Sequence, residues 1–251
     1  MDETGDNAND ERGEVLRGWH FLPADHRLAH GDGRKVRVGE TLSLREGQEV
    51  VLCQFALHGS ENALDALRLG RKPTACRVEV WGDVQRESDK FGGRSRHCLA
   101  MLDASTVLRE FACDWAEKTL WAVVLRTQRM PDLRILRVLE VTRRYVRGLA
   151  TMNELRAANS AAIEATNIST DTFYSAWAAA DAAFEEAAYA ASCTIHDAIA
   201  AISKNASDWA EIQNASDWAE ILRVLNADLE ARLWALLRAQ GYEERSADHD
   251  L

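Results

Sequence analysis

This 251-residue chain has few prolines and no long apolar run, and its first residues do not resemble a signal peptide. These absences narrow the fold and the class of protein. Only three prolines occur, and alanine is abundant, so the composition favours helix. No apolar run reaches the roughly 20 residues that a membrane-spanning helix needs. The opening stretch MDETGDNANDERGE is acidic, the opposite of a secretory signal peptide. We therefore expect a soluble protein of the cytoplasm that makes no membrane contact.

Cysteine is also sparse, and its spacing excludes two further classes. The five cysteines are an odd number without a C-x-x-C pair: Cys53, Cys76, Cys98, Cys113 and Cys193. This pattern argues against a disulfide framework and against a zinc site. We expect small buried thiols in a reducing compartment, and we predict no cofactor.

Charge is abundant but unevenly placed. The formal net charge is −10, and residues 151–251 hold 17 of the 40 acidic residues but only 6 of the 30 basic ones. Such asymmetry bears on partners and on association rates rather than on the fold.

Residues 51–70 predict a strand, a turn and a short helix. The apolar run Val51–Leu57 predicts a buried strand that His58-Gly59-Ser60 ends. The helical spacing of apolar residues over 63–67 predicts a helix, with Ser60 as its cap and Gly70 as its end. Alternating apolar residues predict strands at 36–38, 41–44 and 76–80. Further strands are predicted at 15–22, which Pro23 ends, and at 97–102, with a loop at 85–95.

From Asp103 onward the apolar period becomes helical. Asp103 or Ser105 caps a predicted helix that has one apolar stripe: Leu108, Phe111, Trp115, Ala122 and Leu125. Pro131-Asp132 opens an arginine-rich helix that Gly148 ends. Further helices are predicted from Met152, over the alanine-rich 171–202, and along a leucine stripe that ends at Gly241: Leu222, Leu225, Leu229, Leu233 and Leu236.

The predicted fold class is α+β, a small mixed N-terminal α/β domain followed by an alanine-rich, mainly α-helical C-terminal part. The predicted divisions are a disordered acidic tail (1–14), a mixed α+β domain (15–102), a helical connector packed on it (103–150), an acidic helical domain (151–241) and a tail (242–251). The heptapeptide NASDWAE occurs twice, from Asn205 and from Asn214, and we expect a helix break between the copies.

Several short pieces in the N-terminal 155 residues are specific in order and spacing. They are GWHFL at 18–22, GDGR at 31–34, LHGS at 57–60, ALDAL at 63–67, CRVE at 76–79 followed by Gly82, and RRY at 143–145 followed by Gly148. In these pieces, and in its alanine-rich helical tail, the chain resembles a family of uncharacterised bacteriophage and prophage proteins. The resemblance implies origin in a mobile element and brings no activity with it. Gln54-Phe55-Ala56 departs from the family pattern, where a glycine is expected.

Two groups of residues suggest chemistry, and each has a structural alternative. His58 and Ser60, at a strand end before a helix, could form a nucleophile and its base, with Glu110 or Glu117 as the carboxylate. This arrangement also resembles ADP-ribosyltransferase cores, but the alternative, a turn and a helix cap, is favoured. His26 and His30 have the spacing of helical metal ligands, yet the glycines and Pro23 around them favour a surface loop.

The leading hypothesis is a non-enzymatic phage-type interaction protein, active in the host cytoplasm. Its acidic helices bind a host protein with a basic groove, as a nucleic-acid mimic that inhibits a host defence complex. Direct binding of nucleic acid is not expected. The predicted contact residues are Asp181, Glu185, Glu186, Asp208, Trp209, Glu211, Asp217, Trp218 and Glu220.

Other interpretations stay open. The acidic residues are solvated, or pair with the arginines of 132–148. The chain is a transferase or hydrolase acting through His58 and Ser60. Or it is a self-assembling structural protein, for which the leucine stripe from Leu222 to Leu236 is a homodimer seam.

Overall fold

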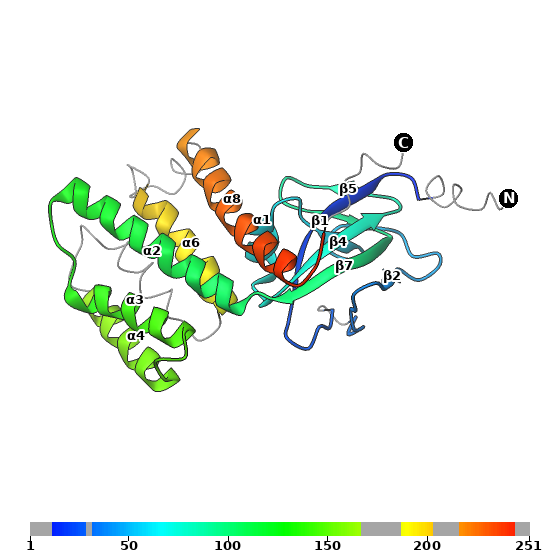
Figure 1. The fold of residues 1–251 in the computed structure, drawn as a ribbon. Helices are drawn as coiled ribbons and strands as arrows, with labels where there is room; N and C mark the ends of the chain where they lie inside the picture. The colour runs from blue at the N-terminus through cyan, green and yellow to red at the C-terminus, as the bar shows by residue number, and fades with distance from the viewer. Residues whose placement is uncertain (1–11, 29–31, 167–186, 203–215, 244–251) are drawn as a thin grey trace. The chain divides into compact units, whose positions relative to one another are not determined.

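The computed structural model describes residues 12–28, 32–166, 187–202 and 216–243 (Figure 1). It confirms the α+β class, because helices accompany two antiparallel sheets. The chain divides into two compact units: residues 1–103 together with 230–251 form the first, and residues 104–229 form the second. Most of the predicted acidic tail lies outside the described residues.

The first unit is built on a four-stranded antiparallel sheet. Its strands, in the order β1-β4-β7-β2, are β1 (Val15–Leu22), β4 (Thr74–Trp81), β7 (Ser95–Asp103) and β2 (Thr41–Ser43). β1 pairs with β4 along its whole length, from Val15 opposite Trp81 to Leu22 opposite Thr74. The strands predicted at 15–22, 76–80 and 97–102 are therefore confirmed as β1, β4 and β7.

A smaller sheet packs on one face of the larger one. It consists of β3 (Leu57–Gly59), β6 (Phe91–Gly93) and β5 (Gln85–Arg86), in the order β3-β6-β5. Phe91 fills the space above Gly18 and Gly59, where an added Cβ would lie within 3 Å of its ring. The core around Phe91 is Leu22, Val36, Cys76, Val78, Val80 and Cys98.

Three of the strand and loop predictions in this unit are wrong. The segment Val51–Phe55 is a tight turn rather than a strand, because Phe55 N–H donates to Val51 O (2.7 Å) and Cys53 has φ +68°. Phe55 is accordingly 50% exposed. Residues 36–38 form no strand, and the predicted loop at 85–95 contains β5 and β6.

α1 (Ala63–Gly70) forms where predicted but has a different cap. Ser60 does not cap it, because its backbone exchanges two hydrogen bonds with Trp19 (2.8 and 2.9 Å) and so extends the sheet. Asn62 occupies the cap position, and Ala63 N–H donates to Glu230 Oε1 (3.0 Å).

The second unit contains α2 (Ser105–Thr127), α3 (Leu133–Val146), α4 (Met152–Thr166) and α6 (Ala187–Ile202). α2 packs against α6 (Figure 1) through small buried residues that include Ala112, Ala116, Ala190 and Ala191. Asp132 caps α3 as predicted, accepting from Arg134 N–H (2.9 Å). For α2 the expected cap is wrong, because Ala104 occupies that position.

α8 (Ser216–Ala239) contributes to both units. Leu225, Leu229 and Leu233 are fully buried within the chain, so most of the predicted dimer seam is not a free surface. Leu237 takes the next buried position, and Leu236 is half-buried. We predicted a single helical domain over 151–241. In the structure, Glu230 and the residues after it group with the first unit.

Aromatic contacts tie the end of α8 into the first unit. The Trp234 ring meets the Trp19 ring edge-on (5.2 Å between centroids) and stacks on Tyr242 (6.2 Å). The Arg77 guanidinium lies 5.4 Å from the centroids of both tryptophan rings. Cation–π contact of this kind adds to the burial of the rings.

Candidate functional site

The two proposed catalytic residues have structural tasks. His58 Nε2 accepts a hydrogen bond from Cys53 N–H (3.0 Å), which holds the 51–55 turn and commits that nitrogen as an acceptor. Ser60 is 2% exposed, and its backbone is paired with Trp19. Glu110 and Glu117 lie on α2 in the second unit, where Glu117 pairs with Arg143 (2.5 Å). The described contacts therefore do not assemble the proposed triad.

The predicted metal ligands are not assembled either. His26 has φ +60° in a loop, with its N–H donating to Pro23 O and its carbonyl accepting from Val36 N–H (both 2.9 Å). His30 lies outside the described residues. In the described part of the chain, no group of three or more His, Cys, Asp or Glu side chains could hold a metal ion.

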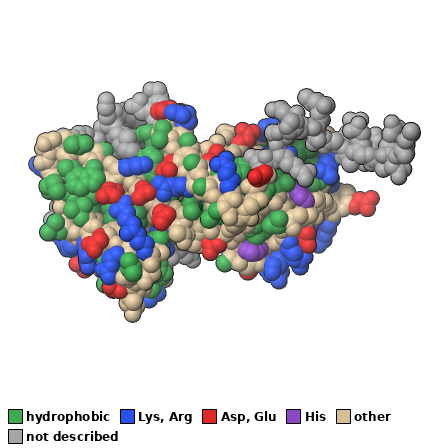
Figure 2. Space-filling view, in the orientation of Figure 1, with side chains coloured by type: hydrophobic (Ala, Val, Ile, Leu, Met, Phe, Trp, Pro, Cys, Tyr) green, Lys and Arg blue, Asp and Glu red, His purple; other side chains and the backbone are tan. Residues whose placement is uncertain are grey.

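The arginines of α3 are matched with nearby carboxylates. Arg143 binds Asp114 (3.1 Å) and Glu117 on α2, and Arg134 binds Asp132 (2.7 Å) and approaches Glu164 on α4. Basic and acidic side chains accordingly interleave over α3 and α4 (Figure 2).

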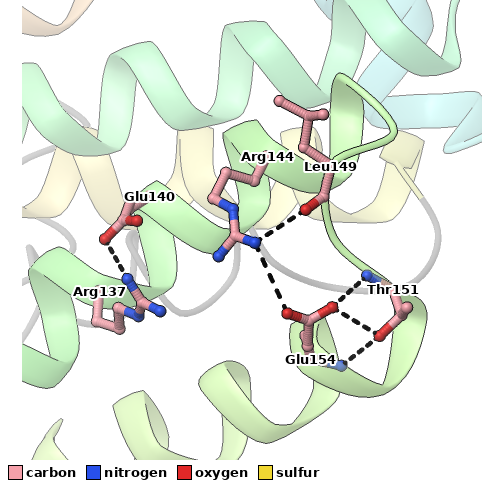
Figure 3. A network of polar contacts seen from close by, with 6 residues as sticks. All are labelled: Arg137, Glu140, Arg144, Leu149, Thr151 and Glu154. Atoms are coloured by element: carbon pink, nitrogen blue, oxygen red, sulfur yellow. Dashed lines mark hydrogen bonds and ion pairs between the residues drawn. The ribbon is translucent and has the colours of Figure 1, made fainter.

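A further network joins α3 to the start of α4 (Figure 3). Arg144 donates to Leu149 O (2.9 Å) and lies 3.8 Å from Glu154, while Arg137 binds Glu140 (2.5 Å). Glu154 accepts from the N–H and hydroxyl of Thr151 (2.7 and 2.9 Å), and these bonds lower its pKa. The network is a capping box at the α4 N-terminus with a cation beside it.

Most of the predicted partner-binding residues lie outside the described residues: Asp181, Glu185, Glu186, Asp208, Trp209 and Glu211. Asp217 and Trp218 belong to the first turn of α8. Glu220 is exposed and pairs with Arg223 (2.6 Å). Farther along α8, Asp228 accepts from Trp115 Nε1–H (2.7 Å), so this carboxylate is used within the chain.

An apolar surface appears where α2 ends and α3 begins (Figure 2). Leu125, Met130 and Leu133 are 73, 67 and 78% exposed, and Trp121 is 40% exposed. Two members of the predicted apolar stripe of α2, Ala122 and Leu125, are therefore exposed. Exposed apolar groups of this size are typical of contact surfaces.

Sequence reasoning missed a polar group inside the first unit. Arg96, on β7, is 3% exposed, and its Nη1 donates to His58 O (2.8 Å). Its Nη2 is buried and has no hydrogen-bond partner among the residues that the structure describes. It shares its face of the sheet with Cys98, two residues along β7. The alternation in Ser95–Leu102 could have placed Arg96 inside, had the whole strand been recognised.

Comparison with protein-family models, with curated proteins and with solved structures gives no match for this chain. Among the helices that the structure describes, none combines the length and the apolar character needed to cross a membrane.

Proposed function

We propose that the chain is a non-enzymatic interaction protein of the bacteriophage or prophage type. Its acidic C-terminal segment binds a host protein that has a basic groove, and takes the place that nucleic acid occupies there. A nucleic-acid-binding complex of host defence is the class of partner that fits this charge.

The proposal rests on the pairing of the α3 arginines. Between residues 171 and 230 the chain has eleven carboxylates but only Lys204 and Arg223 as bases. The α3 arginines were the natural candidates to neutralise them. In the described part of the chain their ion pairs are instead with carboxylates between Asp114 and Glu164. Within the described residues the α3 arginines are thus matched by nearer carboxylates, and the proposal assigns the acidic excess of the C-terminal segment to another molecule.

The alternatives have weaker support. An enzyme acting through His58 and Ser60 would need groups that already hold the turn and the sheet. Self-assembly through the leucine stripe would need Leu225, Leu229 and Leu233, which the chain itself covers. The apolar surface at the α2–α3 corner, by contrast, agrees with an interaction protein.

The test is capture from a bacterial lysate with matched charge variants of the full chain. One variant removes three carboxylates of the acidic segment, D181N/E185Q/E186Q. The control removes two exposed carboxylates and one half-buried carboxylate of the first unit, E46Q/E49Q/D89N. We expect the wild type and the control, but not the first variant, to retain a nucleic-acid-binding protein that high salt releases.

A competition step makes the result specific. Duplex DNA added to the captured complex should displace the chain, because both occupy the same basic groove. Equal capture by the two triple variants, or capture that DNA does not disturb, would contradict the proposal.

A further inference from the structure

The outward face of α3 carries a groove with a volume of about 440 Å³. The described residues that line the groove are Leu133, Arg134, Leu136, Arg137 and Glu140. Residues three and four positions apart lie on the same side of a helix, so Leu133, Arg137 and Glu140 share this side. The buried residues of the helix lie on the opposite side, against the other helices of the second unit.

Apolar side chains are exposed at both ends of this face. Met130, just before α3, is 67% exposed, and Leu133, in its first turn, is 78% exposed. Leu149, just after the helix, is 64% exposed, and its carbonyl accepts from Arg144 (Figure 3). Exposed apolar groups on a face that also holds a groove are typical of a contact surface.

Opposite charges lie between the two apolar ends. Arg137 and Glu140 bind each other (2.5 Å), yet their side chains remain 57 and 55% exposed. Along this face and its border with α4, four arginines are balanced by four carboxylates: Arg134, Arg137, Arg144 and Arg147 against Asp132, Glu140, Glu154 and Glu164. The chain as a whole has a net charge of −10. Two copies therefore meet here without the repulsion that their net charge produces elsewhere.

We propose that two copies of the chain pair through this face of α3, antiparallel about a two-fold axis that passes between positions 137 and 140. Arg137 of each copy then binds Glu140 of the other. The apolar end at Met130 and Leu133 of each copy is directed toward the end at Leu149 of the other. Both copies use the same surface, so the contact closes after two chains.

The order of the side chains favours a second copy over another partner. An apolar end, a central pair of opposite charges and a second apolar end match the same sequence of groups when the helix is reversed. A host protein with a basic groove, the partner proposed above, would meet the arginines of this face and be repelled by them. The pairing of two copies is thus independent of the proposed function, which uses the acidic segment.

The size of the face sets the strength of the dimer. Two helices of 14 residues that pack side by side bury on the order of 1,000 Å², the lower limit of a specific interface. Sedimentation of the full chain should therefore show one chain at about 1 µM and an approach to two chains at about 200 µM. A mass that stays at one chain over this range would overturn the proposal.

Aspartate substitutions test the apolar ends. L133D/L149D should remain a single chain at every concentration, because each copy would place carboxylates against the apolar groups of the other. The control, V38D/L69D, adds the same charge at two apolar residues of the first unit that are 55 and 51% exposed. It should dimerise as the wild type does. Equal association of the two variants would contradict the assignment of the surface.

Charge reversal tests the central pair. R137E alone and E140R alone should each weaken the dimer about tenfold, because like charges then face each other across the axis. An equal mixture of the two variants should regain the association of the wild type, since each glutamate of one copy meets an arginine of the other. The pair within each chain stays broken in the mixture, so recovery can come only from contact between copies.

The double variant R137E/E140R keeps both kinds of pair and should also associate as the wild type does. If the mixture associates no better than the single variants alone, Arg137 and Glu140 are paired only within the chain, and the proposed two-fold contact is wrong.

Discussion

His20 is a histidine that the folded chain keeps neutral. It lies on β1 opposite Cys76. Burial lowers its pKa well below the ordinary value of 6.5, and the nearby charges of Arg96 and His58 lower it further. The unfolded chain takes up a proton near pH 6.5 while the folded chain does not. Stability must therefore fall as the pH drops below 6.5.

The prediction is a difference in slope between wild type and His20→Leu. From pH 7 to pH 5 the wild type should lose up to about 1.4 kcal/mol of unfolding free energy per pH unit more than the variant does. Urea titrations at several pH values measure this directly. Parallel curves for the two proteins would show that His20 titrates alike in both states.

Gly18 is required because of close packing rather than backbone conformation. A Cβ at this position would lie 2.4 Å from Ser60 O and 2.7 Å from the Phe91 ring. The nearer atom belongs to the backbone of the strand bridge, so it cannot move aside as a side chain would.

Gly18→Ala should therefore destabilise the chain by about 3 kcal/mol. Gly47→Ala, where the added Cβ meets nothing within 4 Å but φ is +74°, should cost only about 1 kcal/mol. Chemical denaturation checks both values. Adding Phe91→Leu to Gly18→Ala should not restore stability, and a full rescue would mean that the Phe91 ring, not the Ser60 carbonyl, sets the cost.

At the scale of elements, the end of α8 is part of the N-terminal fold. Glu230 accepts from the first N–H of α1, and Trp234 covers Trp19 and Arg77. Sequence separation hides this, because more than 200 residues lie between Trp19 and Trp234. The first unit therefore depends on residues from both ends of the chain.

Trp234→Ala should destabilise the first unit by about 2 to 4 kcal/mol. The readout is hydrogen exchange at β1 amides, which reports on this unit rather than on the whole chain. Trp121→Ala is the matched control, because this tryptophan is 40% exposed on α2 in the second unit. Equal loss of β1 protection in both variants would contradict the role assigned to Trp234.

The elements that could be predicted are those with long, regular patterns. The apolar stretch of β1, which Pro23 ends, and the Asp132 cap of α3 are local signals, and the structure confirms both predictions. The run 51–55 looked like a strand because its composition is apolar. Its conformation, however, depends on His58 accepting from Cys53 N–H, a contact that composition does not reveal.

The candidate site was harder to predict for the same reason. His58 and Ser60 were singled out for their residue types, but their partners, Cys53 and Trp19, assign them to the fold. Arg96 was overlooked because arginine is ordinarily a surface residue. Its burial follows from the pairing of β7 with β4 and β2, which only the tertiary structure supplies.

At the scale of the whole molecule, charge is the property that points to function. The chain carries a net charge of −10, and the excess lies after residue 150. In the described part of the chain, arginines of α3 pair with carboxylates of α2, α3 and α4. Association driven by such an excess is fast and weakens as salt rises.

The most direct measurement is displacement of duplex DNA from the captured host protein. A labelled duplex is bound to that protein, the full chain is added, and the release of the label is followed by fluorescence anisotropy. We predict complete release by the wild type and by E46Q/E49Q/D89N, with D181N/E185Q/E186Q needing about tenfold more protein because it lacks three phosphate-like charges. A duplex that stays bound while the chain also binds would contradict the mimicry of nucleic acid.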